Sequence, residues 1–138
     1  MKNSFESSNL SCFPVGLDGV SAGFPSPVEN QSGGSLNLTA YLIEHPEATF
    51  FLRVRGDSMI GAGIFDGDLL IVDRSLSPIS GDIVISVIDG EFTVKRLIIR
   101  NDSIELRPEN PKFKSLRISE ESQLDIWGVV TGAVKSFR

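Results

Sequence analysis

The hydrophobic pattern of the chain changes near residue 49. From there onward, short runs rich in Val, Ile, Phe and Thr alternate with turn residues, a pattern typical of β-strands. Before residue 36, Ser, Asn, Gly and Pro recur and no helical or strand period persists. We therefore expect a flexible N-terminal arm over residues 1–35 and a β-rich body over residues 36–138. The strands are expected at Phe50–Arg55, Asp68–Val72, Asp82–Ile88, Glu91–Ile99, Ser103–Arg107 and Asp125–Phe137.

The turns between these segments favour an all-β fold. Asp89 and Gly90 separate two of the segments and form a dipeptide that strongly indicates a hairpin. Six or seven short strands without a long helix predict a mainly all-β body that is compact and closed or strongly curled. One short helix fits residues 36–44, with Ser35 or Asn37 as its cap. The pattern offers no second helix, so we do not expect a helix-turn-helix.

Composition narrows the classes of function. The formal net charge is −5, and residues 1–49 hold one basic and five acidic side chains. A protein that binds DNA through its phosphates needs a basic surface. Because this chain is acidic, we expect no direct sequence-specific DNA binding. No apolar run approaches the ~18 residues of a membrane span, and we expect a cytoplasmic protein without membrane contact. The single cysteine, Cys12, excludes an internal disulfide, and without a Cys/His cluster we expect neither a metal nor a cofactor.

A serine directly follows the first expected strand of the body. Ser58 lies in the sequence Gly56-Asp57-Ser58-Met59. A hydroxyl beside a glycine at the end of a strand is held by a rigid scaffold and is a candidate nucleophile. Alone, such a serine is more often an ordinary turn residue. The simplest oxyanion site next to it would use the backbone N–H groups of Ser58 and Met59.

A lysine lies within the strand expected at Glu91–Ile99. Side chains alternate along a strand, so Lys95 shares one face with Thr93 and the apolar Leu97. Burial would lower the pKa of Lys95, so that its neutral amine could act as a base, and the Thr93 hydroxyl is a candidate to orient it. On its own, a lysine in a strand is more often a solvated surface residue.

Two further features concern the arm and the single histidine. The small residues of Val20-Ser21-Ala22-Gly23 would let an extended backbone enter a narrow cleft, although an ordinary linker has the same composition. His45 has no evident nucleophile as a partner and is expected at the surface, which argues against a Ser-His-Asp triad. A Ser-Lys pair is the remaining serine arrangement.

Several sequence blocks resemble the UmuD branch of the LexA-type self-cleaving proteins. The resemblance runs from about Ala22 to the C-terminus. Matching blocks in the same order are more specific than any single motif. The blocks are residues 22–27 (AGFPSP), 56–59 (GDSM), 66–73 (DGDLLIVD), 81–84 (GDIV) and 89–97 (DGEFTVKRL).

This resemblance implies a self-cleaving serine endopeptidase with a body of the LexA C-terminal type. Ser58 would be the nucleophile, Lys95 the general base, and Ala22–Gly23 the bond that is cut in the protein's own arm. By the same resemblance, a RecA–single-stranded DNA filament stimulates cleavage during the SOS response to DNA damage. The trimmed protein would form a homodimer that joins a UmuC-type Y-family polymerase subunit in error-prone translesion synthesis.

Three other classes of protein share parts of this pattern. A non-catalytic all-β adaptor would bind a polymerase or a filament by strand addition of its arm. A membrane signal peptidase would use the same dyad but requires a spanning segment. A LexA-type repressor requires a DNA-binding domain before the cut, where this chain has only residues 1–22, so we do not expect a repressor.

Overall fold

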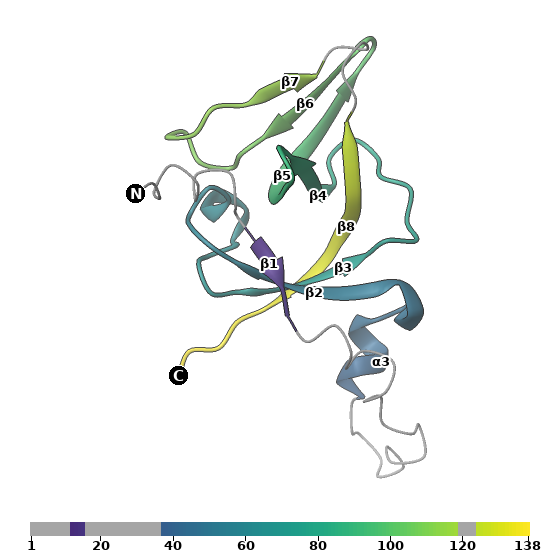
Figure 1. The fold of residues 1–138 in the computed structure, drawn as a ribbon. Coiled ribbons are helices and arrows are strands. Elements are labelled where there is room, and N and C mark those ends of the chain that lie inside the picture. Colours follow the sequence, from purple (N-terminus) through teal and green to yellow (C-terminus); the bar gives the residue numbers. More distant parts are fainter. Residues whose placement is uncertain (1–11, 16–36, 119–123) are drawn as a thin grey trace.

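The protein folds around one antiparallel sheet, seen in a computed structural model that describes residues 12–15, 37–118 and 124–138 (Figure 1). Its strand order is β1-β2-β3-β8-β4-β5-β6-β7. The long strand β8 pairs with β3 on one side and with β4 on the other, and both pairings contain a register shift. The strands are β1 Cys12–Pro14, β2 Thr49–Val54, β3 Leu69–Asp73, β4 Ile83–Ile88, β5 Glu91–Arg100, β6 Ser103–Arg107, β7 Leu116–Ile118 and β8 Asp125–Val134.

All six strands expected from the sequence are present, and the mainly all-β fold class is confirmed. Their ends differ from the expected ones by one residue or less, except that β8 ends at Val134 rather than Phe137. In the turn between β4 and β5, Asp89 has a φ of 53° and Gly90 a φ of 79°. Positive φ at both central residues is what the expected two-residue hairpin requires.

One short α-helix is present, as expected, but it is shorter than residues 36–44. This helix, α3, spans Leu38–Leu42 and is followed by the 3-10 turn η2 at Pro46–Ala48. Asn37 is its cap, because the Asn37 side chain accepts the Ala40 amide at 3.1 Å. A second 3-10 turn, η3, spans Ile60–Ala62.

Two strands, β1 and β7, were not expected. β1 lies inside the expected arm, so residues 12–14 depart from the prediction of an irregular segment. The Cys12 side chain is fully buried, which indicates that tertiary packing fixes a strand where the local sequence shows no strand period. β7 adds three residues at the opposite edge of the sheet. The rest of the expected arm, residues 1–11 and 16–36, lies outside the described residues.

Two apolar clusters stabilise the curled sheet. The two clusters lie on opposite faces of β5. Side chains alternate between the faces along a strand, so Val94 belongs to one cluster and Leu97 to the other. Met59, the residue after Ser58, is packed into the same cluster as Val94. The serine turn is therefore anchored in the core rather than lying loosely on the surface.

Candidate active site

Ser58 lies in the turn that follows β2, and only 8% of its surface is exposed. The Gly56 amide donates to the Asp66 carboxylate at 2.8 Å, and the Ile64 amide donates to the Met59 carbonyl at 3.2 Å. These bonds fix the turn on both sides of the serine. Within the described ranges, the amides of Ser58 and Met59 donate to no other described residue.

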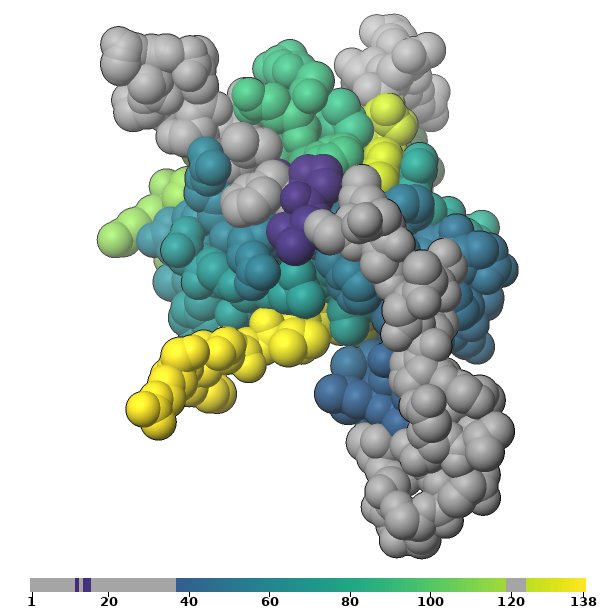
Figure 2. All heavy atoms as spheres, turned by 60° about the horizontal axis from the view of Figure 1, so that its bottom comes forward, coloured from purple at the N-terminus to yellow at the C-terminus, as the bar shows by residue number. Residues whose placement is uncertain are grey.

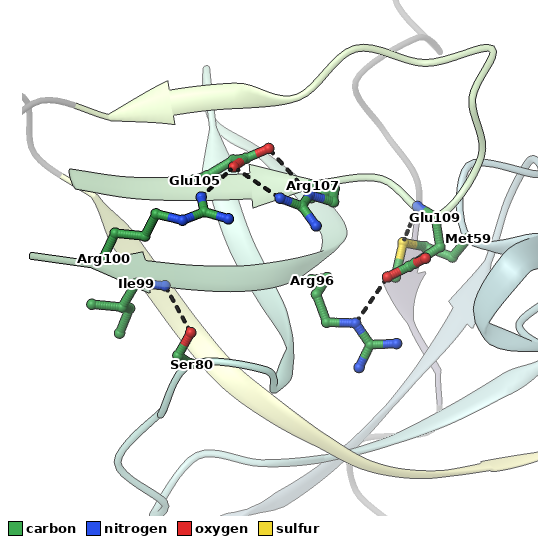
Figure 3. A network of polar contacts seen from close by, with 8 residues as sticks. All are labelled: Met59, Ser80, Arg96, Ile99, Arg100, Glu105, Arg107 and Glu109. Atoms are coloured by element: carbon green, nitrogen blue, oxygen red, sulfur yellow. Dashed lines mark hydrogen bonds and ion pairs between the residues drawn. The ribbon is translucent and has the colours of Figure 1, made fainter.

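The loop after β6 holds the serine turn in place. The Asn110 side chain donates to the Asp57 carbonyl at 2.7 Å, and the Gly61 amide donates to the Glu109 carbonyl at 2.7 Å. The Glu109 amide in turn donates to the Met59 sulfur at 3.4 Å (Figure 3). A Cβ added at Gly61 would lie 2.7 Å from the same Glu109 oxygen. Position 61 therefore requires glycine for this close approach.

The same loop also reaches the strand that carries Lys95. Arg96 Nε donates to Glu109 Oε2 at 3.0 Å, and Arg96 Nη1 donates to the Gly81 carbonyl at 2.8 Å. Glu109 thus contacts both Met59, which is next to Ser58, and Arg96, which is next to Lys95 (Figure 3). Neither Arg96 nor Glu109 was singled out by the sequence, because no local pattern marks an ion pair between separate segments.

Lys95 lies in β5 directly opposite Val84 of β4. Burial lowers the pKa of its ammonium group below the usual value of a lysine, the direction that a general base requires. The Lys95 Nζ donates to the Val94 carbonyl at 3.3 Å. In the part of the chain that the structure describes, no hydrogen bond joins Lys95 to the Ser58 hydroxyl. Such bonds are often long in an enzyme without substrate and shorten when the substrate binds.

Cys12 is an unexpected neighbour of Lys95. It is supplied by β1, which lies against β5, and its side chain has no exposed surface. Burial raises the pKa of the Cys12 thiol to about 12, while the nearby charge of Lys95 acts in the opposite direction. No sequence pattern predicted that a residue of the arm would lie at this position.

Thr93 has a different partner from the one suggested by the sequence. Ser86 stands directly opposite Thr93 in the pairing of β4 with β5. The two buried hydroxyl groups lie 2.8 Å apart, and the Thr93 hydroxyl also lies 3.3 Å from the Ser86 carbonyl. Among the described residues, no hydrogen bond joins the Thr93 hydroxyl to Lys95.

The remaining candidate residues are the two at the expected cut and the single histidine. Ala22 and Gly23 lie outside the described residues, so the structure leaves the expected scissile bond untested. His45 is partly exposed, as expected, and its Nδ1 lies 2.6 Å from Asp73 Oδ2. Asp73 also accepts hydrogen bonds from the amide and the hydroxyl of Ser75. The hydrogen bond between His45 and Asp73 connects the segment before β2 to the end of β3.

A serine held in a tight turn and a partly buried lysine are groups that acyl transfer uses. Among the described residues, no three His, Cys, Asp or Glu side chains are grouped so that they could hold a metal ion. None of the described helices has the length and apolar character needed to cross a membrane.

Comparison with known proteins shows the family to which the chain belongs. The family model described as peptidase S24-like matches residues 14–131. MucA of Salmonella typhimurium is 47% identical over 131 residues, which cover 92% of this chain and 89% of MucA. ImpA of Shigella flexneri is 46% identical over 126 residues, covering 91% of this chain and 85% of ImpA. A LexA repressor of Oleidesulfovibrio alaskensis is 46% identical over 113 residues, covering 82% of this chain but 54% of the repressor. The chain therefore belongs to the S24-like peptidases, the family of the LexA- and UmuD-type proteins.

Proposed function

We propose that the protein is a serine endopeptidase that cuts its own chain between Ala22 and Gly23, with Ser58 as nucleophile and Lys95 as general base. The observation that carries this proposal is the partial burial of Lys95, which lowers its pKa, on a strand whose Val94 packs in the same apolar cluster as Met59 of the serine turn. An exposed lysine titrates near ~10.4 and would be almost wholly protonated at neutral pH. Burial increases the fraction of neutral amine that can accept a proton.

In the proposed first step, the neutral Lys95 amine takes the proton of the Ser58 hydroxyl while the serine oxygen attacks the carbonyl carbon of Ala22. The negative oxygen that forms would be stabilised by the amides of Ser58 and Met59. Lys95 then gives the proton to the nitrogen of Gly23, which leaves as the new amino terminus. The ester that joins Ala22 to Ser58 is hydrolysed by water, which frees the serine.

A tethered substrate suits a base of modest strength. The scissile bond is part of the same chain, so its effective concentration at the dyad is high. Of the residues that link it to Ser58, residues 37–57 belong to the folded body, so residues 24–36 set how far the bond can travel, at most roughly 3.3–3.6 Å per residue, toward the serine of its own copy or of a second copy. An activator would need only to favour the docked conformation of the arm.

We further propose the cellular role that the resemblance to UmuD-type proteins implies. A RecA–single-stranded DNA filament would stimulate the cut during the SOS response in the cytoplasm. Residues 23–138 would then form a homodimer that joins a UmuC-type polymerase subunit in translesion synthesis. The 46–47% identity to MucA and ImpA over most of the chain supports this role.

Intact-mass spectrometry of the purified protein tests the proposal directly. With an activated RecA filament, the full chain should be converted into residues 1–22 and 23–138. Ser58→Ala should remain intact. Ser75→Ala, which removes a different serine hydroxyl, should be cut at the normal rate. A Ser58→Ala protein that is still cut between Ala22 and Gly23 would contradict the proposal and favour a non-catalytic adaptor processed by another protease.

A further inference from the structure

The basic residues of this acidic chain are concentrated in one part of the fold. Residues 95–117 hold seven basic and three acidic side chains, whereas the rest of the chain holds six basic and fifteen acidic ones. This stretch runs from the middle of β5 through β6 to β7, the strand at one edge of the sheet. Figure 1 shows β6 and β7 at the end of the molecule opposite α3, and Figure 2 shows the light-green segment that ends at residue 118 projecting from its side. The net charge of −5 therefore does not describe this end of the sheet, which is positive.

Strand pairing places four arginines on one face of this part of the sheet. Arg96 of β5 stands directly opposite Arg107 of β6, and Arg117 of β7 stands directly opposite Glu105 of β6. Because side chains alternate along a strand, Arg100 shares this face with Arg96. Like charges that stand directly opposite each other on a sheet are destabilising. An anion bound to this face would reduce that repulsion.

Glu105 is the one carboxylate among three of these arginines. It is buried and accepts hydrogen bonds from Arg100 and Arg107, which lie on either side of it (Figure 3). The side chains of these two arginines are still 57% and 41% exposed. Arg117 is exposed and makes no ion pair with any described residue. The fourth arginine of the face is already paired with the loop after β6. The face therefore keeps a positive charge that the described residues do not neutralise.

An exposed aromatic ring lies in the loop that joins β6 to β7. Phe113 is 41% exposed and is followed by the exposed Lys114. The loop is held in place on both sides, since the Phe113 amide donates to the Asn110 carbonyl at 3.0 Å and the Asn110 side chain donates to the Asp57 carbonyl at 2.7 Å. An aromatic ring beside positive charge is the kind of platform on which the bases of a single strand stack.

We propose that this end of the sheet binds single-stranded nucleic acid through its phosphates and its bases, without reading the base sequence. We call the surface the basic face; it consists of Arg100, Arg107, Phe113, Lys114 and Arg117. Guanidinium groups bind phosphate oxygens through paired hydrogen bonds, and the ring adds stacking that a strand with unpaired bases can use. An acidic protein segment would bind the arginines but would not require an exposed ring. The inference does not depend on the proposed function, and it is compatible with the expected lack of sequence-specific DNA binding.

Fluorescence anisotropy of the full-length protein with labelled oligo-dT of about 20 nucleotides tests the proposal. Contacts to three phosphates should make the logarithm of the affinity fall with the logarithm of the salt concentration, with a slope of roughly 2. An abasic strand of the same length keeps the phosphates but cannot stack, so it should bind about fivefold more weakly or worse. Oligo-U should bind within a few-fold of oligo-dT. A preference of more than about tenfold for either strand would contradict recognition through phosphates and stacking alone.

Variants separate the phosphate contacts from the stacking. Arg117→Gln should weaken binding about three- to tenfold and reduce the salt slope by about 0.7–1. Arg138→Gln makes the same change of charge at the exposed C-terminus and should bind within about twofold of the wild type. Phe113→Leu keeps an apolar side chain but no ring, so it should lower the affinity about fivefold or more without changing the salt slope. Phe113→Tyr keeps the ring and should bind like the wild type.

Three results would overturn the inference. Equal weakening in Arg117→Gln and Arg138→Gln would show that overall charge, not the basic face, governs binding. A Phe113→Tyr protein that binds as weakly as Phe113→Leu, at an unchanged melting temperature, would reject stacking on the ring. A peptide of about 20 glutamates that binds as tightly as oligo-dT, together with wild-type binding of oligo-dT by Phe113→Leu, would assign the face to an acidic protein segment instead.

Discussion

Arg96 and Glu109 form an ion pair, with 3.0 Å between Nε and Oε2, that joins β5 to the loop after β6. The two side chains are 28% and 30% exposed, so solvent screens the pair and its contribution to stability is small. Its position matters more than its strength. Glu109 also contacts Met59, so the pair connects the residue after the proposed nucleophile to the residue after the proposed base.

Replacing the Glu109 carboxylate should therefore affect cleavage more than stability. In Glu109→Gln the ion pair is lost while the backbone contacts of residue 109 remain. We expect a change in unfolding free energy of under about 1 kcal/mol and a cleavage rate roughly three- to tenfold lower, because small misplacements of reacting groups are costly. Urea unfolding and intact-mass time courses measure the two quantities.

Glu105→Gln is the matched control for that variant. Glu105 pairs with Arg100 and Arg107 on the same side of the sheet but makes no contact with the serine turn (Figure 3). Its loss should leave the cleavage rate unchanged. Equal slowing in both variants would show that the pairing of Glu109 with Arg96 has no specific role.

Gly61→Ala tests the close approach between the serine turn and the loop after β6. The new Cβ would lie 2.7 Å from the Glu109 carbonyl oxygen, so one of the two segments must move. Overpacking of this kind costs about 1–3 kcal/mol, and the displaced turn should slow cleavage. Gly63→Ala is the control: φ there is +83° and no atom lies near the added Cβ, so it should cost about 1–2 kcal/mol without moving the loop. A normal cleavage rate in Gly61→Ala would argue that the loop does not position Ser58.

The hydrogen bond between His45 and Asp73 predicts that stability depends on pH, separately from catalysis. The hydrogen bond to Asp73 raises the pKa of His45, so its contribution is present below the usual histidine value of ~6.5 and is lost as pH rises through the folded value. Burial alone would raise the pKa of Asp73, but the hydrogen bonds from Ser75 and His45 outweigh it and lower the pKa. The Asp73 contribution is therefore lost only as pH falls below its usual range.

His45→Gln should consequently lower the urea midpoint most between pH ~5 and ~6, with a smaller difference at pH 8. Its cleavage rate at pH 8 should equal that of the wild type, because His45 bonds Asp73 and not Ser58. If His45 were the catalytic base, its replacement would instead abolish cleavage.

Gly23→Glu tests the scissile bond, which lies outside the described residues. A large charged side chain at this position should block entry into a narrow cleft while the melting temperature stays the same. Ser21→Glu introduces the same charge two residues earlier and should be cut faster than Gly23→Glu. Normal processing of Gly23→Glu at the same bond would remove Ala22–Gly23 from consideration.

The fold could be predicted from the sequence where the signal is local. Short runs rich in Val, Ile, Phe and Thr, bounded by turns, mark β2–β6 and β8, and Asp89-Gly90 marks the hairpin because both residues adopt positive φ. β1 could not be predicted in this way. Its three residues lie in a stretch without a strand period, and Cys12 is buried against distant strands.

For the candidate site, too, local sequence signals could be used, but contacts between distant segments could not be predicted. Ser58 and Lys95 were weak candidates from their own neighbours, a turn after a strand and a strand with apolar residues on both faces, and the family resemblance singled them out as a pair. The partner of Thr93 could not, because the position of Ser86 opposite it depends on the register of β4 and β5. Glu109 was missed for a similar reason: its contacts reach Met59, 50 residues away in the sequence.

The pH dependence of spontaneous cleavage tests the dyad itself. Because burial lowers the pKa of Lys95, the rate should rise with pH through a single titration whose midpoint lies below that of a free lysine and is independent of His45. Lys95→Ala should abolish cleavage near neutral pH, and Lys95→Arg should not restore it, because a guanidinium group stays protonated. Lys112→Ala removes an exposed lysine and should leave the whole profile unchanged. A Lys95→Ala protein that cuts itself at the wild-type rate, or a midpoint that follows His45, would exclude Lys95 as the base.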